Sequence, residues 1–297
     1  MKQDIFKDFH PIVNFTYFAF VLGFTMVFNH PAAQAISLLC AIIYAVQCEG
    51  KKAVMFALKF SLPMLLLTAF INPAFNHSGV SILCYLPTGN PLTLESILYG
   101  LSAGTMLAAV LLWFLSFNRV ITSDKFIYLF GRIIPALSLV LSMALRFIPQ
   151  FKVQLEVVKE AQKCIGCDTE NGSIFRRLKN AVTVLSIMIT WSLENAIETA
   201  DSMKSRGYGL KGRTAFSIYR FDERDKITLG IILFCGFYLV IGSFANGFAF
   251  RYFPSIRCVS ANTLTVSFQI MYFVLCIIPV VINRKEAKKW TALRSKI

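Results

Sequence analysis

Residues 93–117, TLESILYGLSAGTMLAAVLLWFLSF, decide the fold, because Glu95 is the only charged residue in this long apolar run. A helix needs about 20 apolar residues to cross the hydrocarbon core of a bilayer, so the run predicts a membrane span. Comparable runs predict five further spans, near residues 12–28, 31–48, 53–72, 227–248 and 264–283. With 56% hydrophobic residues and a mean hydropathy of +0.61, the sequence predicts an all-α integral membrane protein with about six transmembrane helices.

Lysine and arginine are distributed unevenly among the segments that connect these spans. Residues 73–92 contain none and residues 249–263 contain two, whereas seventeen lie from Arg119 to Lys226. Cytoplasmic segments of membrane proteins collect Lys and Arg. We therefore predict a multi-pass protein of the cell membrane, with both termini and residues 119–226 on the cytoplasmic side. The net charge of +14 then fits a basic face beside anionic lipid and does not require a nucleic acid partner.

The predicted organisation has three parts. Residues 1–118 hold the first four transmembrane helices, residues 119–226 form a cytoplasmic helical segment, and residues 227–297 hold the last two transmembrane helices and a basic tail. The central segment places apolar and charged residues at helical spacing, which predicts amphipathic helices at the membrane face. Within it, an apolar run ends at Arg146-Phe147-Ile148-Pro149, where proline predicts a bend.

Two amphipathic stretches of the central segment are each predicted to end at a glycine. The first covers residues 151–166 and the second covers residues 182–207. Glycine takes the left-handed conformation that terminates many helices, and Arg206 in the last turn is favoured by the exposed carbonyls. The two ends are Cys164-Ile165-Gly166 and Ser205-Arg206-Gly207. Each is either an ordinary helix end or a motif that docks a partner.

The chain resembles the transmembrane T component of energy-coupling factor transporters, a family that includes the cobalt-transport permease subunits. The likeness rests on the order of the spans and on three motifs, namely Arg146-Phe147-Ile148-Pro149, Ala161-Gln162 and Ser205-Arg206-Gly207-Tyr208-Gly209. In that family two coupling helices each end in an Ala-Arg-Gly-like motif, which docks into a groove of one ATP-binding cassette ATPase. Arg146 and Pro149 are candidate hinge or packing residues, since helix continuity is weakest at the proline.

The resemblance implies an ATPase-docking site at both helix ends. Its residues are Ser205, Arg206, Gly207, Cys164, Ile165, Gly166 and Lys163. The second end keeps the arginine, with Ser205 in the alanine place. The first end has Ile165 where the family has arginine, and Lys163 is a candidate for the missing charge. The unequal motifs would suit two different ATPases.

The resemblance further implies a non-catalytic subunit that couples hydrolysis by two ATPases to a substrate-binding membrane S component. The sequence agrees, since it has no Gly-rich phosphate loop followed by Lys and Ser or Thr. We predict no cofactor and no metal site. Cys164 and Cys167 have the spacing of a redox or zinc pair, but no second pair completes four ligands. The transported substrate, whether a vitamin or a metal ion, is not specified by this chain.

Other functions remain open in the sequence. A self-sufficient channel or secondary transporter would show internal repeats or interrupted helices. A membrane enzyme would carry acids or histidines inside its spans, where such groups are usually functional, and few are present. Gly100, Gly104, Ala108 and Ala109 form a small-residue surface, which either contacts the substrate-binding subunit or packs inside this chain.

Overall fold

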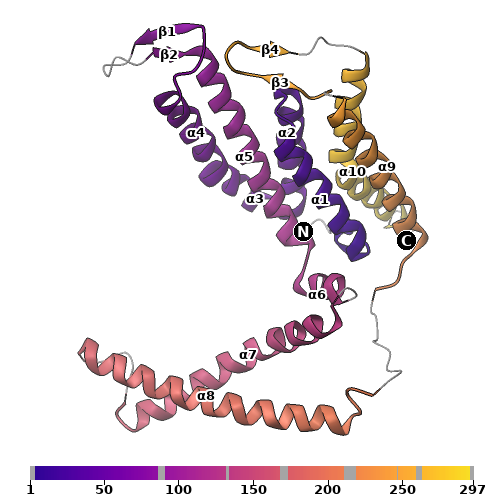
Figure 1. The fold of residues 1–297 in the computed structure, drawn as a ribbon. Coiled ribbons are helices and arrows are strands. Elements are labelled where there is room, and N and C mark those ends of the chain that lie inside the picture. The colour runs from indigo at the N-terminus through magenta and orange to yellow at the C-terminus, as the bar shows by residue number, and fades with distance from the viewer. Residues whose placement is uncertain are drawn as a thin grey trace. The chain divides into compact units, whose positions relative to one another are not determined.

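The computed structural model describes residues 4–85, 91–131, 134–167, 173–210, 219–245, 247–258 and 263–294, and these are mostly helical (Figure 1). The helices in chain order are η1 (Ile5–Asp8), α1 (Pro11–Val27), α2 (Pro31–Glu49), α3 (Lys51–Phe56), the π-helical turn η2 (Ala57–Ser61), α4 (Leu62–Phe75), α5 (Leu94–Val120), α6 (Ser123–Gly131), α7 (Pro135–Cys164), α8 (Ile174–Ser205), α9 (Glu223–Phe244) and α10 (Thr263–Arg294). Two short hairpins complete the described elements: β1 (Ile82–Tyr85) with β2 (Pro91–Thr93), and β3 (Phe250–Arg251) with β4 (Arg257–Cys258).

The apolar helices begin and end within four residues of the six predicted spans, except that α10 continues to Arg294, eleven residues past the predicted end at residue 283. Five described segments are long and apolar enough to cross a membrane: α2, the continuous stretch from α3 to α4, α5, α9 and α10. The sixth apolar helix, α1, is shorter, with 17 residues. This arrangement confirms the prediction of an all-α, multi-pass membrane protein.

The chain divides into two compact units. The membrane unit comprises Met1–Phe126 and Tyr219–Ile297, and the crossed-helix unit comprises Ile127–Ile218. The apolar helices and both hairpins belong to the membrane unit, whereas α7 and α8 form the crossed-helix unit. The helix α6 begins in the membrane unit and ends in the crossed-helix unit.

Two of the apolar helices begin at the same dipeptide, His-Pro. His10 and His30 are the N-cap residues of α1 and α2. The Nδ1 atom of each accepts a hydrogen bond from the backbone N–H two residues later, at 3.3 Å from Ile12 and 3.2 Å from Ala32. Proline at the first helical position removes an N–H that has no helical partner in any case. The dipeptide therefore fixes where each helix starts.

Aromatic rings from α1, α2 and α5 form the centre of the membrane unit. Tyr17, Phe18, Tyr44 and Trp113 are fully buried, and their ring centroids lie 5.2 to 6.5 Å apart. The indole N–H of Trp113 donates to the Ser37 hydroxyl at 3.0 Å. Lipid cannot satisfy polar groups, so such internal pairing is required within a bilayer. The rings hold three helices together as one body.

The helix α4 packs on α5 across the small residues of α5. A Cβ atom placed on Gly100 would lie 3.0 Å from the Thr68 carbonyl oxygen, and one placed on Gly104 would lie 2.8 Å from that of Leu65. The first distance is tight for a Cβ atom and the second is shorter than Cβ atoms normally approach, so the two backbones lie close together, as small residues allow in membrane helices. The small-residue surface is therefore used for packing inside the chain at these two glycines.

The two hairpins occupy the connecting segments that contain few or no lysines and arginines. In the first, Ile82 lies opposite Thr93, and in the second Phe250 lies opposite Cys258. Both hairpins lie at the same end of the membrane unit (Figure 1). These strands were not predicted, because two to four residues are too few to show an alternating pattern.

Candidate docking site at the ends of two crossed helices

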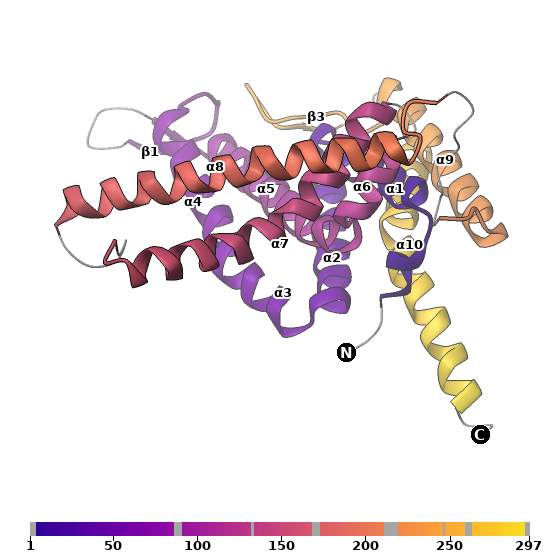
Figure 2. The same cartoon turned by 90° about the horizontal axis from the view of Figure 1, so that it is seen from below.

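The helices α7 and α8 cross and contact each other through a small apolar core (Figure 1 and Figure 2). Val158 of α7 and Val184 and Met188 of α8 are buried at the crossing. Phe151 and Trp191 border this core, with their rings edge to face and their centroids 5.5 Å apart. Burying one Val or Met side chain contributes at most about 3 kcal/mol. This small core holds the two helices together at the crossing point. Most other residues of α7 and α8 are exposed.

The helix α7 continues through Pro149, where we predicted a bend. Arg146 and Pro149 both lie inside the helix and are exposed. The Arg146 guanidinium lies 5.4 Å from the ring centroid of Phe147. Proline removes one backbone hydrogen bond, and water can satisfy the carbonyl of Leu145 at an exposed position. The apolar and amphipathic runs on either side of Pro149 thus form one helix, and a hinge role for the two residues stays a prediction.

A glycine turn closes the C-terminus of α7. Gly166 has a φ of 82°. Its N–H donates to the Lys163 carbonyl at 3.0 Å, and the N–H of Cys167 donates to the Gln162 carbonyl at 2.9 Å. This pair of bonds is the Schellman motif, for which glycine is preferred because it has no Cβ atom. The turn leaves the Ile165 side chain 73% exposed at the tip of the helix.

The C-terminus of α8 is closed by the same turn. Gly207 has a φ of 73°. Its N–H donates to the Lys204 carbonyl at 2.9 Å, and the N–H of Tyr208 donates to the Met203 carbonyl at 3.0 Å. Arg206 precedes the glycine and is exposed.

Ile165 and Arg206 thus hold the same place in the same turn, and only the side chain differs. The first end presents an apolar group and the second presents a cation. The two ends lie on opposite sides of the crossing in both views (Figure 1 and Figure 2). The structure therefore does not bring the two motifs together, and the two ends present separate surfaces.

The other predicted docking residues lie beside these two positions. Lys163 and Cys164 are exposed in the last turn of α7. Ser205 is exposed at the end of α8, where its hydroxyl donates to the Ser202 carbonyl at 2.8 Å. Leu210 was not among the predicted docking residues, yet it follows the second turn and is 72% exposed. The second end therefore combines a cation with apolar surface.

A stripe of exposed apolar residues runs along α8. This α8 stripe consists of Ile174, Leu178, Val182, Leu185, Ile189, Leu193 and Ile197, each more than half exposed. The residues recur every three or four positions and so share one helix face. Met188 is another apolar residue of α8, but it is buried against α7 and does not belong to this stripe. An exposed apolar surface of this length marks a contact with lipid or with another protein.

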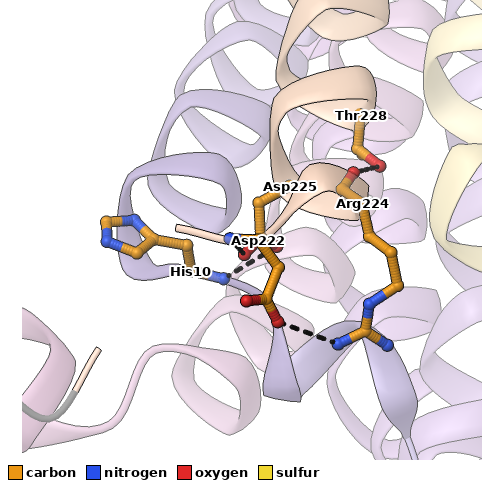
Figure 3. Close-up of polar contacts among 5 residues, drawn as sticks. All are labelled: His10, Asp222, Arg224, Asp225 and Thr228. Carbon is orange, nitrogen blue, oxygen red and sulfur yellow. Dashed lines mark hydrogen bonds and ion pairs between the residues drawn. The ribbon is translucent and has the colours of Figure 1, made fainter. Parts of the chain in front are cut away.

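A polar cluster where α9 begins was also missed by sequence reasoning (Figure 3). Asp222 and Asp225 form a capping box at this helix start, and Arg224 pairs with Asp222 at 3.6 Å. The Thr228 hydroxyl donates to the Arg224 carbonyl at 2.8 Å. Asp225 also accepts a hydrogen bond from the backbone N–H of His10 at 3.3 Å. The three-residue spacing of the two acids is a recognisable helix-start signal, but the contact with His10 leaves no trace in the local sequence.

Comparison with known proteins places the chain in a family. Residues 11–216 match the family described as cobalt transport protein, CbiQ. Part of the chain is similar to proteins named energy-coupling factor transporter transmembrane protein EcfT. The relative from Lactobacillus helveticus is 35% identical over 106 residues, which cover 35% of this chain and 38% of the relative. The relative from Lacticaseibacillus paracasei is 38% identical over 98 residues, 33% of this chain and 37% of the relative.

A third relative, named EcfT 1 and from Listeria monocytogenes, is 34% identical over 106 residues, 35% of this chain and 40% of the relative. The chain thus spans about two fifths of the length of the curated relatives it matches. The family match is broader, since residues 11–216 make up well over half of the chain. It confirms the resemblance drawn from the motifs and the order of the spans, and this chain belongs to the CbiQ family of cobalt transport proteins.

Proposed function

We propose that the chain is the membrane-embedded coupling subunit, or T component, of an energy-coupling factor importer. Three relatives that it resembles bear names of that kind. The observation that carries the proposal is the matched pair of glycine-closed helix ends at Gly166 and Gly207. Two such ends on crossed helices offer one contact site to each of two ATP-binding cassette ATPases. The ATPases hydrolyse ATP, and this chain transmits their motion.

Arg206 is the proposed main contact at the second end. Its guanidinium carries five donors and stays charged at neutral pH. Among the described residues, no salt bridge occupies this group. A hydrogen bond to a carboxylate in a partly buried groove contributes about 1.5–3 kcal/mol. Leu210 adds exposed apolar surface beside it.

Ile165 is the proposed main contact at the first end, and it requires a different groove. Burying this exposed side chain contributes up to about 3 kcal/mol without a carboxylate. Lys163, exposed in the same turn, adds a charge beside it. Two non-identical ATPases, one with an acidic groove and one with an apolar groove, fit this difference.

The α8 stripe is the proposed contact for the substrate-binding membrane subunit. That subunit would present apolar helices, and the stripe offers apolar side chains over most of the length of α8. The small-residue surface of α5 is a poorer candidate, because Gly100 and Gly104 are already packed against α4.

The proposed orientation places both termini and the crossed-helix unit in the cytoplasm, with the hairpins outside. Two native thiols test this, since Cys84 in β1 and Cys164 at the end of α7 are both exposed. In single-cysteine variants within intact cells, a membrane-impermeant maleimide should label Cys84 and leave Cys164 unlabelled until the cells are lysed. The reverse pattern would contradict the orientation.

The experiment that tests the function compares wild type with Arg206→Glu. Each tagged chain is expressed with its neighbouring genes and purified in detergent, and the ATPases that remain bound are quantified. Charge reversal should prevent the ATPase of the second end from binding, because the introduced carboxylate would repel the proposed carboxylate in the groove of the ATPase. The matched control is Lys179→Glu, which reverses an exposed charge on the same helix far from its end.

Three outcomes are informative. Loss with Arg206→Glu alone supports a coupling subunit docked through α8. Retention in both variants contradicts docking through this end. Recovery of no ATPase with wild type, from membranes in which the complex was shown to be intact, overturns the proposal and favours a self-sufficient channel or transporter.

A further inference from the structure

A short segment before α1 joins two helices that are remote in sequence. This segment, residues Asp4–His10, is named the N-terminal clasp here. The Asp4 carboxylate accepts hydrogen bonds from the Asn283 amide of α10 at 2.7 Å and from the Tyr44 hydroxyl of α2 at 3.2 Å. The amide oxygen of Asn283 accepts in turn from two consecutive backbone N–H groups of the clasp, at 3.0 and 3.1 Å. The clasp is thereby fixed to α2 and α10.

Phe6 anchors the clasp in the aromatic core. The side chain is fully buried, and its ring centroid lies 5.3 Å from that of Tyr17 and 6.4 Å from that of Tyr44. Edge-to-face contacts of this kind favour one geometry over others. The clasp is therefore a packed part of the membrane unit.

Lys125 ties the clasp to the point where the chain leaves the membrane unit, after Phe126. Lys125 is only 4% exposed, and its ammonium donates to the carbonyls of Lys7 and, at 3.3 Å, of Phe9. The Asn14 side-chain amide is oriented so that its nitrogen and its oxygen both have hydrogen-bond partners. In this orientation the oxygen accepts a third hydrogen bond from the Lys125 ammonium, at 2.6 Å. Three donors thus meet three acceptors.

The charge of Lys125 is compatible with this buried position. Burial lowers the pKa of Lys125 to about 8, while the nearby Asp8 carboxylate acts to raise it. At pH 7 the side chain is therefore mostly protonated and able to make all three bonds.

The clasp also holds the point where the chain returns, at Tyr219. Asp225 is 4% exposed and accepts from the backbone N–H of His10 at 3.3 Å. The Phe221 ring lies edge to face with the imidazole of His10, 4.7 Å between centroids, and the Tyr219 ring lies 6.3 Å from it. The Arg224 guanidinium lies 5.7 Å from the ring centroid of another clasp residue, Phe9.

The two connections are close to each other as well. Burial and, secondly, the carboxylate of Asp124 raise the pKa of Tyr219. Asp124 belongs to the outgoing connection and Tyr219 to the returning one, so the clasp is contacted by two neighbouring segments rather than by two distant ones.

We propose that the N-terminal clasp is a shared attachment through which both connections to the crossed-helix unit are held to the membrane helices, with Lys125 and Asp225 as its positioning residues. The inference deepens the proposed coupling function and rests on it for its purpose. Motion imposed on α7 and α8 by ATPases would reach α2 and α10 through Lys125 or Asp225, then the clasp, then Asp4 and Asn283.

The test is hydrogen–deuterium exchange on the full chain in detergent, comparing wild type with Lys125→Met. Methionine is of similar length and donates no hydrogen bond. Amides of residues 5–10 should exchange roughly tenfold faster or more, as expected when charged hydrogen bonds are lost. Amides of residues 219–226, on the other connection, should accelerate with them. Lys51→Met, the same change at an exposed lysine, should alter neither segment.

Acceleration confined to residues 5–10 and 123–126 would overturn the proposal, because the returning connection would then be held independently. A milder variant covers the case in which Lys125→Met fails to fold. Phe221→Leu removes a partly exposed ring from His10 and should accelerate exchange at residues 123–126 as well as at 219–223. A change restricted to residues 219–223 would count against a shared attachment.

A second measurement separates this inference from the proposed function. Lys125→Met leaves both glycine-closed ends intact, so ATPases should still co-purify. Adding a non-hydrolysable ATP analogue to the wild-type complex should change exchange at residues 5–10, and the variant should lose this response. An unchanged response in the variant refutes the transmitting role. If wild type captures no ATPase, the coupling function fails, yet exchange in the chain alone still decides whether the clasp joins the two connections.

Discussion

The ends of α7 and α8 share a backbone shape and differ in chemistry. Gly166 and Gly207 close the same turn, with φ of 82° and 73° and equivalent hydrogen bonds. The residue before the glycine is Ile165 in one case and Arg206 in the other. The turn depends on the glycine and on main-chain bonds, and any preceding side chain permits it. Shape and surface chemistry are therefore set by different residues, so the two ends can present different contacts in one geometry.

The largest expected effect comes from placing a carboxylate at the apolar end. Ile165→Asp loses up to about 3 kcal/mol of apolar burial and adds the cost of desolvating a charge. ATPase binding at this end should fall roughly 100-fold or more, measured by titrating the solubilised chain with the ATPase. Ile165→Val is the matched control and should fall less than about tenfold. Equal losses for Asp and Val would contradict an apolar groove.

A pair of variants tests whether the two ends truly differ. Arg206→Ala should weaken binding at the second end by about 1.5–3 kcal/mol, roughly a tenfold to 150-fold loss. Ile165→Arg makes the first end resemble the second, and its effect should be confined to the ATPase of the first end. Calorimetric titration with each ATPase separately would show this. If the two substitutions alter association equally, unequal docking is wrong.

The smallest expected effect concerns the shared turn itself. Gly166→Ala and Gly207→Ala each force an L-residue into the left-handed region, at about 1–2 kcal/mol. A Cβ atom at Gly207 would also lie 3.0 Å from the Cδ1 atom of Leu210, whereas no atom of the described residues lies within 4 Å of a Cβ atom placed at Gly166, so the end of α8 should be destabilised slightly more. Exchange of the amide that follows each glycine should rise about tenfold or more.

Gly23→Ala is the control for that pair. Gly23 lies inside α1, where no atom of the described part of the chain would lie within 4 Å of a Cβ atom, and its φ is not positive. Alanine there should leave stability unchanged or slightly raised, because alanine is the better helix former. No change at Gly166 or Gly207 would mean that the turn does not depend on glycine.

The spans and the two glycine ends could be predicted because each leaves a local signal. A long and mainly apolar run, such as residues 93–117, indicates a membrane span, and a glycine after an amphipathic run marks a helix end. The burial of Met188 could not be predicted in the same way. It shares an apolar face with Leu185 and Leu193, and only the angle at which α7 crosses decides that Met188 alone of these is buried.

The N-terminal clasp shows why the remaining features escaped prediction. Lys125 looks like one of many basic residues in the segment predicted to be cytoplasmic, and Asn283 looks like a polar residue at the end of a predicted span. Their partners are more than a hundred residues away in the sequence, at Lys7 and Asp4. No spacing rule links such positions, so only the packed structure reveals that these groups are paired.

The crossing point of α7 and α8 divides the two helices unequally. At about 1.5 Å per helical residue, Ile165 lies roughly 10 Å along α7 from Val158, and Arg206 lies roughly 27 Å along α8 from Met188. A rotation of about ten degrees around that point displaces Arg206 by roughly 5 Å and Ile165 by roughly 2 Å. If the crossed pair turns as one body about that point, the arginine end would move further than the isoleucine end, and a smaller force would suffice to move it.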